Sequence, residues 1–99
     1  MTKLFISQPM KGKSDDEIIK ERTRIINAVK ETYGEDTEIL DSYFKGAPQD
    51  ATPLWYLGES LKVLSKADIA YFAAGWENAR GCRIEHTCAE EYGIKTITK

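Results

Sequence analysis

Only Asp68 is charged in the run Ala67-Asp68-Ile69-Ala70-Tyr71-Phe72-Ala73, and every other position is apolar or aromatic. A strand that is apolar on both faces is typical of the centre of a parallel sheet covered by helices on both sides. We therefore expect this run to be the central strand of the domain. Asp68 opens the strand and is expected to cap the turn that precedes it.

The rest of the chain alternates between strand and helix patterns. Short β-prone runs predict strands, and apolar residues at helical spacing predict helices. In chain order we expect a strand at 4–6, a helix over 15–33, a strand at 37–40, a helix over 53–64, the central strand, a helix over 80–92 and a strand at 94–98. This alternation favours parallel pairing through right-handed crossovers. We predict one α/β domain over residues 1–99, with three helices and a Rossmann-like or flavodoxin-like parallel sheet of four strands in the order 2-1-3-4.

Local signals mark the ends of the predicted helices. Ser14 and Glu17 have the spacing of a capping box, and Thr52-Pro53 reads as an N-cap followed by proline at the first helical position. Gly34 is expected to close the first helix in a left-handed conformation. Asn78 is the expected N-cap of the third helix.

Composition limits the classes of function. The 99 residues are 41% hydrophobic and 30% charged, with a net charge of −2. This balance is that of a folded globular domain, and it lacks the basic footprint that binding to polymeric nucleic acid requires. Two cysteines and one histidine are too few for a zinc site, so we expect no metal. No apolar run reaches membrane length and the N-terminus does not read as a signal peptide, so we expect no membrane association and a cytoplasmic location.

Ligands of such sheets bind at the carboxyl ends of the strands. The first of these segments is 7–12, in which backbone N–H groups and the Lys11 ammonium would hold a phosphate or a sugar hydroxyl. The alternative is a plain connecting turn with a solvated lysine, because one glycine is a weak signal. The candidate binding residues of this segment are Ser7, Gln8, Met10, Lys11 and Gly12.

The helix that follows the central strand carries an acid on its apolar side. A helical projection places Gly81, Glu85, Cys88, Ala89 and Tyr92 on one face, which we expect to pack on the sheet. Most helical glutamates are solvated surface residues. The apolar surroundings of Glu85 favour a functional carboxylate near a helix N-terminus instead.

Other candidates come from the second and third strand ends. Trp55, Tyr56 and Trp76 are candidates for stacking on a nucleobase, although aromatic residues of this size usually fill cores or interfaces. Trp76 is favoured, because it lies in the loop before the Glu85 helix. Asp41 and Tyr43 are weaker candidates for binding ribose hydroxyls. His86 is expected to point away from Glu85 on the helix. The stretch 44–51 is a candidate lid, and the second helix is expected to bury Leu54, Leu57, Leu61 and Leu64.

Three segments together resemble the nucleoside 2-deoxyribosyltransferase-like family, including its nucleotide N-glycosidase branch and its short bacterial and phage members. They are 5–12 (FISQPMKG), 67–72 (ADIAYF) and 81–89 (GCRIEHTCA). The resemblance implies that Glu85, four residues after Gly81, is the nucleophile. It also implies that 7–12 binds the sugar or its phosphate, and that the protein transfers or hydrolyses at the N-glycosidic bond of a nucleoside or nucleotide without a cofactor.

The sequence differs from that family at two positions. Phe5 stands where the family commonly has a tyrosine, and Ala79 where it tends to have Asp or Ser. These differences motivate an alternative, a nucleotide-binding module without turnover. A third possibility is an interaction protein with no small-molecule ligand.

The second helix also predicts self-association. It carries Trp55, Tyr56 and Val63 in addition to its leucines, which is more apolar surface than one sheet face requires. Family members form dimers or larger assemblies, so the resemblance favours the same conclusion. We expect a homodimer or a multiple of one; the alternative is a monomer in which Trp55 and Tyr56 lie under the 44–51 loop.

Overall fold

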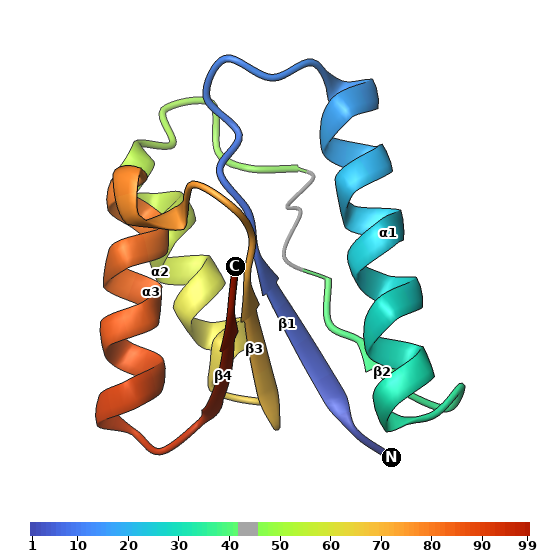
Figure 1. Ribbon diagram of the computed structural model, residues 1–99. Helices are drawn as coiled ribbons and strands as arrows, with labels where there is room; N and C mark the ends of the chain where they lie inside the picture. Colours follow the sequence, from blue (N-terminus) through green and yellow to red (C-terminus); the bar gives the residue numbers. More distant parts are fainter. Residues whose placement is uncertain (42–45) are drawn as a thin grey trace.

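The computed structural model describes residues 1–41 and 46–99, and it has the predicted α/β architecture (Figure 1). The strands are β1 (Lys3–Ser7), β2 (Glu38–Ile39), β3 (Ile69–Phe72) and β4 (Lys95–Thr98). The helices are α1 (Asp15–Tyr33), α2 (Pro53–Leu64), α3 (Arg80–Glu91) and a 3₁₀ turn, η1 (Trp76–Asn78). All strand pairs are parallel and the sheet order is β2-β1-β3-β4, as predicted.

The alternation of side chains along β1 and β3 divides the core into two layers. Leu4, Ile6, Ile69 and Tyr71 pack with Ile25 and Val29 of α1. Phe5, Ala70 and Phe72 pack on the other face with Leu64 of α2 and Ala89 of α3. Figure 1 shows α1 on one side of the sheet and both α2 and α3 on the other. The full burial of β3 confirms its predicted central place.

The predicted N-caps of α1 and α2 are confirmed, whereas the predictions for the C-terminal end of α1 and the N-cap of α3 are wrong. Ser14 and Glu17 form the capping box, and Thr52 caps α2 with Pro53 at the first position. Gly34 has a positive φ of 112° but a ψ of 153°, so it is not in the left-handed helical conformation. The chain turns at Glu35 and Asp36 before β2, and the Thr37 N–H donates to the Gly34 carbonyl at 3.2 Å. Asn78 belongs to η1, so Ala79 occupies the N-cap of α3 and supplies no side-chain hydrogen bond.

Three side chains lie differently from what their patterns predict. Leu54 is 73% exposed, because the first turn of α2 borders open grooves instead of the sheet. Tyr92 is 84% exposed, because α3 ends at Glu91 and its apolar face does not continue. Asp68 accepts a hydrogen bond from the backbone N–H of Lys3 at 2.8 Å, and thereby ties β3 to the start of β1 instead of capping a turn.

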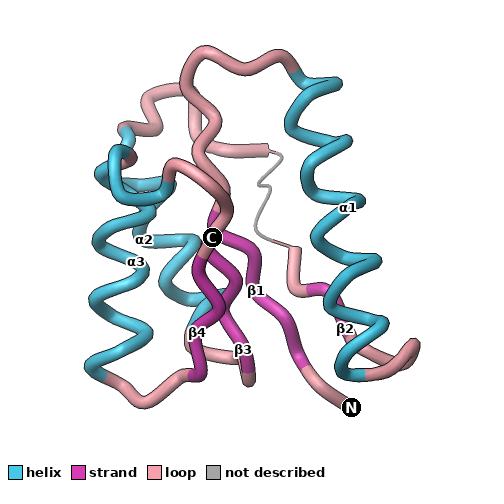
Figure 2. The backbone as a smooth tube through the Cα atoms, viewed as in Figure 1, coloured by secondary structure: helices cyan, strands magenta, loops and turns pink. Residues whose placement is uncertain are grey.

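The carboxyl ends of the strands lie at one end of the sheet. Figure 2 shows the loops that leave β1 and β3 at this end, together with the first turns of α2 and α3. Among the described residues, none of the helices is both long and apolar enough to cross a membrane.

Candidate functional site

A pocket of about 400 Å³ opens between the end of β1, the first half of α2 and the start of α3. It has residues from all three segments in its walls because parallel strands deliver their carboxyl ends to the same edge. The described lining residues are Phe5, Ile6, Ser7, Gln8, Pro9, Met10, Pro53, Tyr56, Leu57, Ser60, Ala79, Gly81, Cys82 and Glu85.

Glu85 provides the carboxylate of this pocket, and it is only 7% exposed. The hydroxyl of Ser7, the last residue of β1, donates a hydrogen bond to Glu85 Oε1 at 2.7 Å. Ser60 of α2 makes a second side-chain hydrogen bond to the carboxyl group. The acid is therefore positioned by hydroxyls from two elements that are distant in sequence.

The protonation of Glu85 reflects opposing effects. Burial raises the pKa of the Glu85 carboxyl group above its usual value, because the charged form loses water. The hydrogen bonds from Ser7 and Ser60 oppose this rise by favouring the carboxylate. The two hydroxyls thus help to keep a buried acid ionised, as a nucleophile requires.

Cys82 lies one turn before Glu85 and lines the same pocket. Burial raises the pKa of its thiol, and the nearby charge of Glu85 raises it further, while a hydrogen bond with Ser7 lowers it. Because a protonated thiol is a poor nucleophile, Cys82 is the weaker of the two candidates. Across the described chain, no three His, Cys, Asp or Glu side chains gather as a metal site.

Five of the sequence-predicted site residues come together in this pocket: Ser7, Gln8, Met10, Gly81 and Glu85. Lys11, Gly12 and Asp41 are exposed and are not among its described lining residues. Tyr43 lies outside the described residues, as do Phe44 and Lys45 of the predicted lid.

Trp76 does not line the pocket, contrary to its expected place beside Glu85. Its ring stacks on His86 with the centroids 4.2 Å apart and lies 5.8 Å from the ring of Phe72. His86 points away from the carboxyl group of Glu85, as predicted, and its Nδ1 lies 3.1 Å from Glu90 Oε1. The Trp76 side chain therefore packs η1 onto α3.

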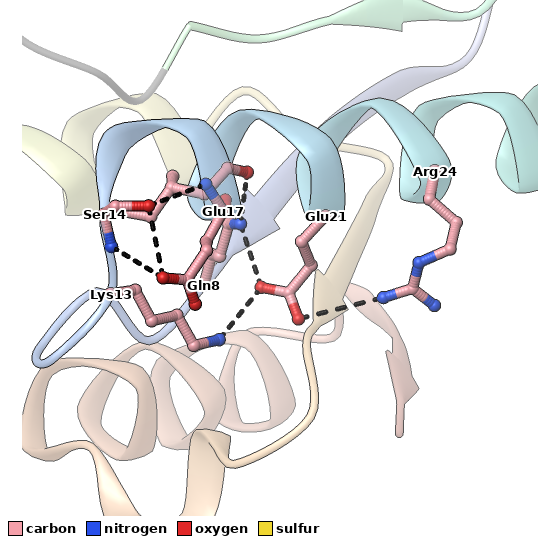
Figure 3. A network of polar contacts seen from close by, with 7 residues as sticks. Gln8, Lys13, Ser14, Glu17, Glu21 and Arg24 are labelled. Atoms are coloured by element: carbon pink, nitrogen blue, oxygen red, sulfur yellow. Dashed lines mark hydrogen bonds and ion pairs between the residues drawn. The ribbon is translucent and has the colours of Figure 1, made fainter.

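Gln8 lines the pocket, but its amide group is held by α1 (Figure 3). Its Nε2 donates hydrogen bonds to the Ile18 carbonyl at 2.8 Å and to Glu21 Oε1 at 2.9 Å. The Lys13 ammonium group also binds Glu21 Oε1, at 3.2 Å. These contacts fix the loop after β1, so Gln8 and Lys13 position the segment that carries Ser7.

Of the α2 residues that line the pocket, sequence reasoning named only Tyr56, as one of three aromatic residues that could stack on a nucleobase. It did not find the contribution of Leu57 and Ser60. A usable signal was present at Ser60, which lies three residues after Leu57 and four before Leu64 on the apolar side of the helix. A hydroxyl at such a position has to find a polar partner when the helix packs. Its partner, Glu85, is known only from the tertiary structure.

Comparisons with known proteins give one match. The sequence model of the family described as "Domain of unknown function (DUF4406)" matches residues 2–98. Searches of curated proteins and of solved structures gave no match.

Proposed function

The chain belongs to this DUF4406 family, and we propose that it cleaves the N-glycosidic bond of a nucleoside or nucleotide with Glu85 as the nucleophile. The observation that carries the proposal is the buried Glu85 carboxyl group in an open pocket, bound by the hydroxyls of Ser7 and Ser60. An acid that is desolvated beside a cleft costs stability. Such acids are found preferentially at functional sites.

The proposed reaction has two steps. Glu85 attacks the anomeric carbon, so that a C–O bond forms while the C–N bond breaks, and the base leaves with the electron pair and takes a proton from solvent. Water then displaces the carboxylate and yields the free sugar; a second base in its place yields a new nucleoside. Two displacements at one carbon give net retention of configuration.

The resemblance to the nucleoside 2-deoxyribosyltransferase-like family supports the same reaction. It assigns the nucleophile to Glu85 and the substrate-binding loop to 7–12. Only part of that segment lines the pocket, namely Ser7, Gln8 and Met10 together with Pro9. The sugar is therefore expected to bind nearer to Ser7 than to Lys11.

One observation favours the alternative of a nucleotide-binding module without turnover. Phe5 and Ala79 both line the pocket, and neither supplies the hydroxyl or carboxyl group found at these positions in the family. Such a module would bind the ligand and release it unchanged, whereas the enzyme would release free base.

The deciding experiment is incubation with ribonucleosides, 2′-deoxyribonucleosides and their 5′-monophosphates, followed by chromatography for free base. The wild type and the Glu91→Gln variant, which alters an exposed acid on the same helix, are expected to release base. Base release in neither, or equal release by a Glu85→Ala variant, would contradict the proposal. A thermal shift with the ligand recovered intact would support the binding module instead.

Ser7→Ala is expected to move the acid limb of the kcat/KM profile to higher pH. The Ser7 hydroxyl lowers the pKa of Glu85, so its loss extends the pH range in which the carboxyl group is protonated and inactive. Ser60→Ala is expected to shift the limb in the same direction, and Ser65→Ala, outside this pocket, to leave it in place. A Ser7→Ala limb at or below the wild-type pH would contradict the role assigned to Ser7.

We further propose that the chain forms a homodimer through the outer face of α2 and α3. Leu54 is 73% and Ile84 38% exposed, and both border the groove between these helices. Leu54→Glu is therefore expected to dissociate the dimer, because it places a charge in a desolvated interface. Sedimentation at micromolar concentration tests this, and a single wild-type species near 11.2 kDa would contradict it.

A cytoplasmic location is part of the same proposal. Cys82 and Cys88 are both free thiols. Unpaired cysteines are typical of proteins in reducing compartments.

A further inference from the structure

We infer that the pocket takes an uncharged nucleoside in preference to its 5′-monophosphate. This inference rests on the proposed function and narrows its substrate class. Three ionisable side chains are among the described residues that line the pocket, namely Glu85, Cys82 and Tyr56. The part of the lining that the structure describes includes no lysine, arginine or histidine.

Among the described cations close in the chain to lining residues, Lys11, Lys13, Arg80 and Arg83 are not themselves lining residues. Lys11 is exposed. Lys13 is paired with Glu21 at 3.2 Å on the α1 side of the loop after β1. The Arg83 guanidinium donates to the Glu77 carbonyl at 3.0 Å. Arg80 lines the adjoining groove between α2 and α3, which shares Pro53, Leu57 and Gly81 with the pocket. Phosphate groups are usually bound by such cations. The described walls of this pocket include none of them, although the charge of Lys13 reaches Cys82 and lowers the pKa of its thiol.

The rest of the lining is suited to a nucleobase. Apolar surface from Phe5, Met10, Pro53 and Leu57 surrounds the pocket, and Tyr56, 43% exposed, offers an aromatic ring at its wall. Apolar and aromatic groups bind the faces of a base, but they cannot replace the water around a phosphate dianion. At a pH above its pKa, the Glu85 carboxylate would repel that dianion in a site of low dielectric.

The closing experiment measures binding to the wild-type protein, so its result does not depend on turnover. Calorimetric titrations use each 2′-deoxynucleoside and the matching 5′-monophosphate at low salt. We expect at least one nucleoside to bind about tenfold or more tightly than its monophosphate, because like charges are brought together in the complex. The ratio of the monophosphate Kd to the nucleoside Kd is expected to fall as salt is added. Equal or tighter binding of the monophosphates, or no binding in either series, would overturn the inference.

Met10→Lys supplies the gain-of-charge variant. Met10 lines the pocket and is 43% exposed, so a lysine there adds a cation without filling the core. We expect the Met10→Lys variant to bind monophosphates more tightly than the wild type does, and so to lower the ratio of the monophosphate Kd to the nucleoside Kd. Ile19→Lys is the matched control, because Ile19 is 59% exposed on α1 and is not among the described lining residues of either groove, and it should leave the ratio of the two affinities unchanged. Nucleoside-selective binding without base release would contradict the proposed cleavage alone and leave this inference supported.

Discussion

Glu85→Gln is expected to lower kcat/KM for base release by roughly 10⁶-fold, the scale of losing a residue that acts as the nucleophile. Glutamine keeps the size of the side chain and a carbonyl oxygen that accepts from Ser7. It cannot form the glycosyl ester. Steady-state assays on the best substrate measure the loss, with Glu91→Gln as the matched control. A loss of less than about tenfold would contradict the nucleophilic role of Glu85.

The same variant is expected to be more stable than the wild type at neutral and alkaline pH. Because burial raises the pKa of Glu85, the folded protein retains a proton that the unfolded chain, with a pKa of about 4.3, has released. Between those two pKa values the free energy of unfolding falls as pH rises, and above both the carboxylate destabilises the fold by a constant amount.

Urea denaturation between pH 4 and pH 8 tests this stability effect. The advantage of Glu85→Gln over the wild type should shrink as pH falls through the raised pKa. Glu91→Gln, again the control, should follow the wild type. A Glu85→Gln variant that is less stable than the wild type at pH 8 would contradict the account of a costly buried charge.

Phe72→Ala is expected to reduce the free energy of unfolding by about 3–5 kcal/mol. Phe72 is fully buried, belongs to the core between the sheet and α2 and α3, and lies against the rings of Trp76 and His86. Alanine would leave a cavity that β3, hydrogen-bonded on both edges, has little freedom to close. This is a large part of the roughly 5–15 kcal/mol that holds a domain folded.

Chemical denaturation monitored by circular dichroism measures the change in stability. Tyr92→Ala is the control, because this aromatic residue is 84% exposed and its loss should change stability by less than about 0.5 kcal/mol. A Phe72→Ala variant within about 1 kcal/mol of the wild type would show that the core relaxes around the missing ring.

Local patterns were sufficient to predict the elements, the parallel sheet and its order. Helix starts such as Ser14 with Glu17 depend on hydrogen bonds within one turn, so nearby residues determine them. The central place of 69–72 could be predicted because a strand covered on both faces has to be apolar throughout. The same reasoning placed Glu85 on the buried side of α3 and brought Ser7 to the same edge of the sheet.

Contacts between distant segments decided the rest of the candidate site. Ser60 meets Glu85, Gln8 is held by Glu21, and Trp76 stacks on His86. Periodicity gives the face of a helix on which a residue lies, but the partner of that face depends on how far each element extends along the sheet. Leu54 illustrates this: it continues the leucine pattern of α2, yet it lies beyond the sheet and is exposed. The sequence by itself therefore determined the helices and strands and the position of Glu85 on the buried side of α3. Only the tertiary packing decided which hydroxyl groups and apolar side chains surround the Glu85 carboxyl group, because those contacts depend on long-range geometry.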